Sequence, residues 1–462
     1  MMSQNQQHSG ESSFGDETRK ALENFGMGTP SADPALSCVP PQLITAYAEV
    51  KWAALEAVQE EESRFSAEQM AVLRQTLTGI IRGEMDDAFP LPMAQGGAGT
   101  SLHLNLNEVL AAAVKQAGLP APDPFEDLAR FQSTNDTFAS AVVIMAFRLA
   151  EKAEEDTISL QEILVDLEGR FDHILMTGRT ELRDALPMRA GTLFGAWAGA
   201  AERDRWRLSK VAERVREIPL GGTALGTGFG APRSYSHSAE RHLRRITGLP
   251  LARSQNMADG VALKDSLAEV AGALKLASSS TARIAGDLLF YASSPVGEIV
   301  HPELQYGSSM MPLKANPVLL ERCRGLALSA MGEADKTALY ATEGQLQLNA
   351  YLPFLCRSLS LCARETSIAR NDLIRYLSLM EVRPERMEAN LARSAAMLNA
   401  LTPILGYRAL KTLAEEVEKE APETLDELAA LAARHTRRPV EEIRRALSPG
   451  RLAGPPPGES LA

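Results

Sequence analysis

The chain has 462 residues, more than one simple hydrophobic core holds, so two or three domains are expected. Hydrophobic residues make up 45% and charged residues 23%, an ordinary composition for a soluble globular protein. The net charge of −11 argues against a general nucleic-acid surface, but a locally basic site for an acidic substrate is compatible with it.

The ends and the cysteines bear on location. The N-terminus has neither the basic start nor the apolar core of a signal peptide, and no uncharged apolar run is long enough to span a bilayer. We therefore expect a cytoplasmic protein without membrane association. The cysteines have no CxxC or Cys/His ligand spacing, so we expect buried reduced thiols and no metal centre. They are Cys38, Cys323, Cys356 and Cys362.

Residues 1–130 are expected to form an N-terminal helical domain. Its first part, residues 1–15, is polar and is predicted to be disordered. Helical patterns cover residues 41–61 and 66–86. The stretch 89–100 is predicted to be a loop because glycine and proline interrupt it, and an apolar helical run follows.

Residues 131–380 carry the clearest periodic signal. Apolar or small residues recur in steps of four and three along Leu263–Tyr291, which predicts a helix face about 43 Å long at 1.5 Å per residue. Shorter copies run along Leu348–Cys362 and Phe138–Leu149. Strand signals are almost absent, so we predict an all-α central bundle of long helices; Gly/Pro loops favour this over separate coiled coils.

Residues 381–462 change to short helices separated by prolines. We expect a small C-terminal helical domain whose tail, Ser448–Ala462, is disordered. The predicted helices are Met387–Leu401, Gly406–Glu420, Thr424–Thr436 and Val440–Leu447.

Four polar motifs border the long helices. Each has a plain structural interpretation, as a turn, an N-cap cluster, an ion pair or a loop between helices. Together they supply many hydroxyl and amide donors and one lysine, a set that suits a dicarboxylate held by neutral donors. The motifs are Gly97–Ser101, Gln132–Asp136, Gly178–Ala185 (in which Arg183 and Asp184 are the expected ion-pair members) and Gly307–Pro317.

The last motif is the least ordinary of the four. Gly307 and Pro312 prevent a continuous helix and leave backbone N–H groups unpaired in a loop. Pro317 fits the first position of a new helix, whose N–H dipoles face back toward the loop. Hydroxyls, a cation and an amide in such a loop suit the binding of an oxyanion.

These motifs resemble the aspartase/fumarase superfamily of lyases. Its signature of glycine, two serines, Met-Pro, Lys and Asn-Pro is matched along Gly307–Pro317, and the likeness extends to Phe14–Phe25 and Leu220–Gly228. The likeness covers residues from about 14 to 430. Gly97–Ser101 followed by Asn105–Leu110, together with the threonine in Gln132–Asp136, is most similar to the aspartate ammonia-lyase branch.

The resemblance implies a three-domain all-α lyase that forms a homotetramer around a twenty-helix core, with active sites shared by three subunits. It implies reversible β-elimination of ammonia or an amine from L-aspartate or a related succinyl compound, giving fumarate. Ser308 is the expected base, activated by loop N–H groups and Lys314. The expected substrate-binding residues are Thr100, Ser101, Ser133, Thr134, Asn135, Thr180, Glu181, Ser309, Lys314 and Asn316.

Several departures from the family concern the substrate. Glu181 stands where the family commonly has His or Gln; a carboxylate there favours a cationic leaving group, unless it is protonated and shares a proton with Glu321. Tyr306, Leu313 and Ala315 also depart from the family pattern. Fumarase-type hydration of malate and a catalytically silent structural paralogue remain alternatives. No cofactor is expected, with activation by Mg²⁺ left open.

Overall fold

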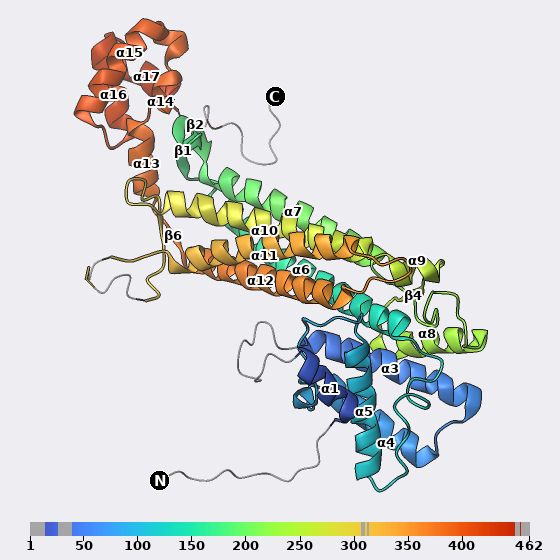
Figure 1. Ribbon diagram of the computed structural model, residues 1–462. Coiled ribbons are helices and arrows are strands. Elements are labelled where there is room, and N and C mark those ends of the chain that lie inside the picture. Colours follow the sequence, from blue (N-terminus) through green and yellow to red (C-terminus); the bar gives the residue numbers. More distant parts are fainter. Residues whose placement is uncertain (1–13, 26–38, 306–309, 312–313, 449–452, 454–462) are drawn as a thin grey trace, which may run out of the picture. The chain divides into compact units, whose positions relative to one another are not determined.

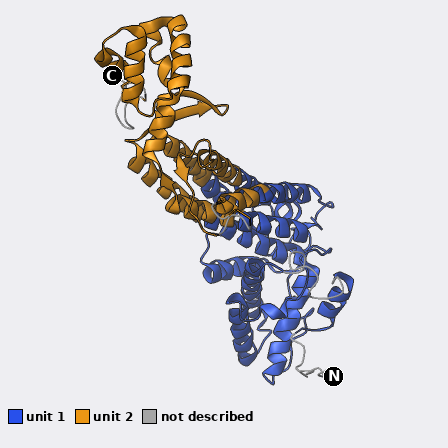
Figure 2. Cartoon of the chain, turned by 90° about the vertical axis from the view of Figure 1, so that its left-hand side faces the viewer, with its two compact units in different colours: residues 1–153, 207–276, 329–365 blue, residues 154–206, 277–328, 366–462 orange. Residues whose placement is uncertain are grey.

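A computed structural model describes residues 14–25, 39–305, 310, 311, 314–448 and 453. The chain divides into two compact units, each assembled from separate stretches of sequence (Figure 2). Unit 1 comprises residues 1–153, 207–276 and 329–365, and unit 2 comprises residues 154–206, 277–328 and 366–462.

Long helices dominate the described chain, as predicted (Figure 1). The boundaries between the units fall within each of these helices. Each contributes one part of its length to the core of unit 1 and the other part to the core of unit 2. The long helices are α6 (Thr134–Phe171), α7 (Ala190–Arg214), α10 (Asp265–Tyr291), α11 (Val318–Thr342) and α12 (Leu352–Leu379).

The periodic face of α10 is buried as expected. Every stripe position from Leu267 to Tyr291 is buried, because steps of four and three return to one face of a helix with 3.6 residues per turn. Leu263 is an exception: it follows the short helix α9 (Met257–Ala262), lies outside α10 and is exposed. The predicted stripe therefore begins one turn too early.

The two shorter stripes are confirmed except at one end of each, because Leu348 lies before α12 and Leu149 is only half-buried. In α12 the residues Leu352, Leu355, Leu359 and Cys362 are buried, and the helix starts immediately before Pro353, where its missing N–H costs no intrahelical bond. In α6 the corresponding positions of the first turns are buried from Phe138 to Met145.

Unit 1 contains shorter helices besides the long ones. The carboxylate of Glu108 on α5 accepts hydrogen bonds from the backbone N–H groups of Gly15 (3.0 Å), Glu17 (2.8 Å) and Thr18 (3.1 Å). These bonds hold the start of α1 against α5. Helix α3 packs against α4 and α8. These elements are α1 (Asp16–Phe25), α3 (Pro41–Glu62), α4 (Ala67–Ile81), the 3₁₀ turn η1 (Asp86–Ala88), α5 (Thr100–Gln116), the paired strands β3 (Glu217–Ile218) and β4 (Ala252–Arg253), and α8 (Arg233–Thr247).

Unit 2 contains the longest strands of the described chain, which the sequence did not predict. Strands β1 (Leu175–Thr180) and β2 (Arg183–Arg189) form an antiparallel hairpin, so the motif Gly178–Ala185 is a hairpin tip and not a loop between helices. The two-residue turn is formed by Glu181 and Leu182, both with positive φ (51° and 60°). Such turns are usually recognised by Asn-Gly or Asp-Gly, and neither is present.

The C-terminal part of unit 2 is a set of short helices, as predicted. The predicted helix Met387–Leu401 is divided in two, and α15 is bent at Gly406, whose φ of 73° is not helical. The elements are β5 (Ile299–Val300) and its partner β6 (Glu381–Val382), α13 (Pro384–Arg393), α14 (Ala395–Asn399), α15 (Thr402–Glu420), α16 (Leu425–Thr436) and α17 (Val440–Ala446).

The predicted disorder at the two ends falls mainly outside the described residues. The boundaries near residues 130 and 380 stay predictions, although α6 begins at Thr134 and α12 ends at Leu379. Of the cysteines, Cys323, Cys356 and Cys362 are buried and form no disulfide, and Cys38 lies outside the described residues. Across the described part of the chain, no helix combines the length and the apolar character that crossing a membrane requires.

Candidate functional site

The motif Gly97–Ser101 forms the start of helix α5. The Thr100 hydroxyl donates to the carbonyl of Gly97 at 2.8 Å, and the Thr100 side chain is exposed. Gly99 has a φ of 92°, and a Cβ at this position would lie 2.6 Å from the ring of Phe138. Only glycine combines this conformation with so close an approach, so the first turn of α5 packs directly on the first turns of α6.

The motif Gln132–Asp136 forms the start of helix α6. The Ser133 hydroxyl accepts from the N–H of Asn135 at 3.2 Å, so the predicted N-cap interpretation is confirmed for this serine. Thr134 begins the helix and is half-buried. The Asn135 amide donates from Nδ2 to the carbonyl of Ala224 at 2.8 Å, and its Oδ1 is the acceptor of the same amide group.

Five predicted site residues thus meet where two helices of unit 1 begin: Thr100, Ser101, Ser133, Thr134 and Asn135. A buried bridge joins the two helix starts. The Tyr47 hydroxyl bonds Nδ1 of His103 in α5 at 2.8 Å and the Thr137 hydroxyl in α6 at 3.2 Å. Two helix N-termini side by side bring two positive dipole ends together, an arrangement suited to a carboxylate.

Buried ionisable groups lie beneath this motif, and the sequence did not assign them to the site. Asp136 is fully buried, which raises its carboxyl pKa to about 6 against the opposing effect of bonds from backbone N–H groups. Burial also lowers the pKa of Lys51 to about 7. Burial, followed by the nearby Lys51 charge, holds the pKa of His103 well below its usual value, so that its ring is neutral near pH 7.

The sequence contains a signal for two of these buried groups, Asp136 and Lys51. Asp136 directly follows the predicted residue Asn135, and Lys51 is a lone cation in an otherwise apolar part of α3. Burial itself could not be read from the sequence, so neither residue was singled out.

In unit 2, the predicted residues Thr180 and Glu181 lie exposed at the tip of the β1–β2 hairpin. Of the two expected ion-pair members, Asp184 is confirmed, because it accepts from Nε of Arg179 at 3.2 Å, whereas Arg183 forms no ion pair within the described residues. The Arg179 guanidinium also donates from both terminal nitrogens to the buried carboxylate of Glu298, at 2.9 and 2.7 Å. This pairing fastens the hairpin to the segment preceding β5.

The Gly307–Pro317 motif is described only in part. Ser308 and Ser309 lie outside the described residues, so their predicted roles stay predictions. Lys314 is exposed and Asn316 is half-buried, just before α11. Pro317 precedes the first helical residue, Val318, so its predicted position in the first turn is wrong by one residue.

Glu321 lies in the first turn of α11 and is exposed, as Glu181 is. No hydrogen bond joins the two carboxylates within the described part of this single chain, and their sharing of a proton stays a prediction.

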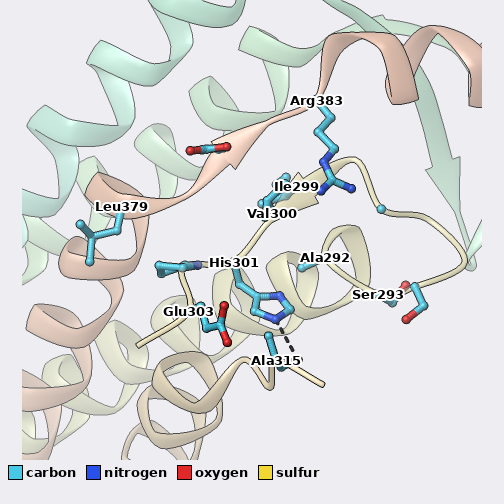
Figure 3. A pocket seen from close by; sticks show the side chains of 13 residues that line it. Ala292, Ser293, Ile299, Val300, His301, Glu303, Ala315, Leu379 and Arg383 are labelled. Carbon is cyan, nitrogen blue, oxygen red and sulfur yellow. Dashed lines mark hydrogen bonds between the residues drawn. The ribbon is translucent and has the colours of Figure 1, made fainter. Parts of the chain in front are cut away.

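A pocket of about 500 Å³ in unit 2 lies at the base of this motif (Figure 3). It is lined by β5, β6 and the ends of the neighbouring helices, including His301, Glu303 and Arg383. His301 donates from Nε2 to the carbonyl of Ala315 at 3.1 Å, which places its proton on Nε2. The bond joins the chain before the signature motif to the chain after Lys314.

The remaining predicted residues thus belong to unit 2: Thr180, Glu181, Lys314, Asn316 and Glu321. The described residues contain no cluster of three or more His, Cys, Asp or Glu side chains arranged to hold a metal ion. The predicted site residues that the structure describes supply hydroxyls, amides, helix N-termini and a few charged side chains.

Comparison with known proteins agrees with this chemistry. A family model described as "Lyase" matches residues 9–332. Aspartate ammonia-lyase of Bacillus subtilis is 31% identical over 455 residues, covering 96% of this chain and 93% of that protein. Class II fumarate hydratase of Helicobacter pylori strain J99 is 29% identical over 456 residues, covering 96% and 95%.

A solved structure of fumarate lyase:delta crystallin from Brucella melitensis has a TM-score of 0.86 and 30% identity to this chain, with 96% of each chain covered. The agreement extends over both units, including the helical stretches that carry the polar motifs. Together with the matching family model, it shows that the chain belongs to the aspartase/fumarase superfamily of lyases.

Proposed function

We propose that the protein catalyses reversible β-elimination of ammonia or an amine from L-aspartate or a related succinyl compound, giving fumarate. The observation that carries the proposal is the close approach of the α5 and α6 N-terminal turns, at which Thr100, Ser133 and Asn135 stand. The similarity to an aspartate ammonia-lyase supports it.

Carboxylate binding is central to this reaction. A proton on the carbon next to a carboxylate is very weakly acidic, so its removal requires stabilisation of the dianionic enediolate that results. One well-placed oxyanion donor contributes roughly 3 kcal/mol of transition-state stabilisation. The hydroxyls of Thr100, Ser133 and Thr134, next to helix N-termini, are suited to that carboxylate, to which Ser309 is also assigned. Thr180, Lys314 and Asn316 are assigned to the other carboxylate.

Ser308 is the proposed base, acting as an oxyanion held by loop N–H groups and the Lys314 charge. It takes the proton from the carbon next to one carboxylate. The C–N bond then breaks, its electron pair leaves with nitrogen, and the double bond of fumarate forms. A substrate ammonium group thereby departs as neutral ammonia.

The leaving group is assigned from Asn135 and Glu181. Because the Asn135 amide donates to Ala224, its Oδ1 is available to accept from a substrate N–H. Glu181 brings a carboxylate where an ammonium group gains a charge-assisted bond and a hydroxyl gains less. These two side chains favour an amine over water as the leaving group.

The protein is further proposed to act as a cytoplasmic homotetramer with shared sites. Predicted site residues such as Glu181 and Lys314 are exposed in the single chain. Large apolar side chains are also exposed on the long helices: Leu276, Leu328 and Leu339. Contacts between copies would cover such positions.

Fumarase-type hydration is the second candidate, because a class II fumarate hydratase has almost the same identity to the chain over the same coverage. The two candidates differ in leaving group and share the base and the carboxylate contacts. A catalytically silent structural paralogue is the third.

The deciding assay follows fumarate absorbance when the purified protein is given L-aspartate or L-malate. We expect fumarate from aspartate and, in reverse, its consumption only when ammonia is present. Fumarate from malate alone would establish the second candidate, whereas no change with either substrate would leave the silent paralogue.

Ser308→Ala should abolish turnover, because no other group in the motif replaces the base. Ser159→Ala is the matched control, since the Ser159 hydroxyl is exposed and donates only to the carbonyl of Glu155 one helical turn earlier. Retention of most activity in Ser308→Ala would remove this serine as the base.

A further inference from the structure

The stretch Leu220–Gly228 resembles the family but has no role in the proposed reaction. It forms a tightly constrained loop in unit 1. Gly221 has a φ of 88°, and a Cβ there would overlap the hydroxyl of Ser236. Thr223 also has a positive φ of 56°, which is uncommon for a side chain branched at Cβ. Such a conformation persists only when the surroundings determine it.

Asp136 is the group that determines it. One carboxylate oxygen, Oδ2, accepts from the N–H groups of Gly221 at 2.9 Å and Thr223 at 3.0 Å. The other oxygen, Oδ1, accepts from the N–H of Ser133 at 3.1 Å. A single fully buried side chain therefore holds the start of α6 and the loop together.

The same two segments meet a second time through Asn135, which donates to the carbonyl of Ala224. Lys51 holds the chain that leads into α6: its Nζ donates to the carbonyl of Leu128 at 3.1 Å and to Oε1 of Gln132 at 2.6 Å. The orientation of the Asn135 amide thus depends on where the loop carbonyl lies, and that position depends on Asp136.

We propose that Asp136 is a positioning residue of the lyase site, which holds the loop Leu220–Gly228 against the start of α6 and thereby aims Asn135 and Ser133 at the substrate. The inference rests on the proposed function for its effect on catalysis. Its structural part, the linking of two segments by one carboxylate, can be tested without turnover.

The carboxylate form is required, since each oxygen accepts from backbone N–H groups. An amide in its place keeps one acceptor and directs an NH₂ group at a backbone donor. Misplacement of a binding group by about 1 Å lowers rates by roughly a hundredfold. In Asp136→Asn we therefore expect kcat/KM for L-aspartate to fall by about one to two orders of magnitude, with a raised KM contributing.

Protonation of Asp136 has a similar effect. The ionisable groups that interact with its charge are Lys51 and Tyr47 on α3 and Tyr235 on α8. Because burial raises the Asp136 pKa to about 6, kcat/KM of the unmodified protein should fall below that pH, and this acid limb should be missing in Asp136→Asn.

Glu108→Gln is the matched control. Glu108 is also a largely buried carboxylate of unit 1 that accepts from several backbone N–H groups, but it fastens α1. We expect this variant to lose stability while keeping KM and the acid limb. Equal changes of KM in both variants would reduce Asp136 to a general structural role and overturn the proposal.

Amide hydrogen exchange completes the test on the intact chain. Asp136→Asn should speed exchange of the Ser133, Gly221 and Thr223 N–H groups, whereas Glu108→Gln should speed exchange around Gly15–Thr18 only. If these amides keep their protection in Asp136→Asn, the link itself is wrong. If the link holds but the unmodified protein turns over neither substrate, the proposed function is wrong while the link stands. Full activity in Asp136→Asn would overturn the positioning role and leave the proposed function intact.

Discussion

Arg179 forms a buried ion pair that contributes to the stability of the fold around the β1–β2 hairpin. Its guanidinium binds the fully buried Glu298 with two nitrogens, and Asn390 donates to the same carboxylate at 2.8 Å. The pairing holds together the hairpin, the segment before β5 and α13. Removing one partner of such a pair leaves an uncompensated charge in the interior.

We expect Arg179→Met to lower the free energy of unfolding by about 3–5 kcal/mol, measured by urea denaturation. Replacing Glu298 by Gln in the same chain should recover part of the loss. Arg170→Met is the control: Arg170 and Asp166 are exposed partners 3.4 Å apart, and losing this pair should cost less than about 1 kcal/mol. Equal losses in Arg179→Met and Arg170→Met would contradict the buried-pair argument.

At the scale of residues, the sequence identified side chains that act through their own polar groups. Thr100, Ser133 and Asn135 stand in recognisable motifs, and the structure places these motifs at two helix starts that pack on each other. Asp136 and Lys51 act through burial and through bonds to distant backbone groups. Those properties depend on which segments meet in space, so a residue pattern could not reveal them.

At the scale of elements, the long helices were predictable and the hairpin was not. An apolar repeat that continues over many turns, as in α10, predicts a helix even where single residues do not fit the pattern. The β1–β2 hairpin has short strands and a turn, Glu181–Leu182, without glycine or asparagine. Its conformation follows from packing against α13 and α14 and from the Arg179 pair, which local propensity does not contain.

The conformation of the Glu181–Leu182 turn leads us to expect that a substitution at Leu182 stabilises the protein. Leu182 is 74% exposed and has a φ of 60°, a conformation that costs a non-glycine residue roughly 1–2 kcal/mol. Leu182→Gly should remove this conformational cost, which exceeds the entropy that a glycine loses on folding. The melting temperature should therefore rise by a few degrees.

Leu186→Gly provides the comparison for that substitution. Leu186 is also exposed, but it lies within strand β2, where glycine only weakens the strand. Its melting temperature should fall. A lower melting temperature for Leu182→Gly as well would show that the turn is not strained.

At the scale of the whole molecule, buried lysine makes stability depend on pH. Burial lowers the Lys51 pKa to about 7 in the folded chain, below the value near 10.4 of an unfolded lysine. Between these values the unfolded chain binds a proton that the folded chain does not bind. The free energy of unfolding contributed by this group therefore rises as the pH increases from about 7 to about 10.

Urea denaturation of the unmodified protein and Lys51→Met across this pH range tests the effect. The variant should show a smaller rise, or a steeper fall, of unfolding free energy with pH. Lys210→Met should follow the unmodified protein, because Lys210 is exposed and pairs only with Glu213 one turn away. Parallel curves for Lys51→Met and the unmodified protein would contradict the assignment.

The division into units was beyond the reach of the sequence. Continuous stripes along the long helices suggested one central bundle, and α10 does bury a single face throughout. Yet each long helix supplies residues to two separate cores. An apolar repeat indicates which face of a helix is buried. It does not indicate which other elements bury each part of that face.

The three buried thiols have a use in following this division. A thiol reacts with alkylating reagents as an exposed thiolate, and burial raises the pKa of Cys323 to about 12 and that of Cys356 further. Cys323 belongs to unit 2, whereas Cys356 and Cys362 belong to unit 1. With Cys38 replaced by serine, the labelling rate of each native thiol reports how often its own unit opens, so the two opening frequencies can be compared without introducing any probe.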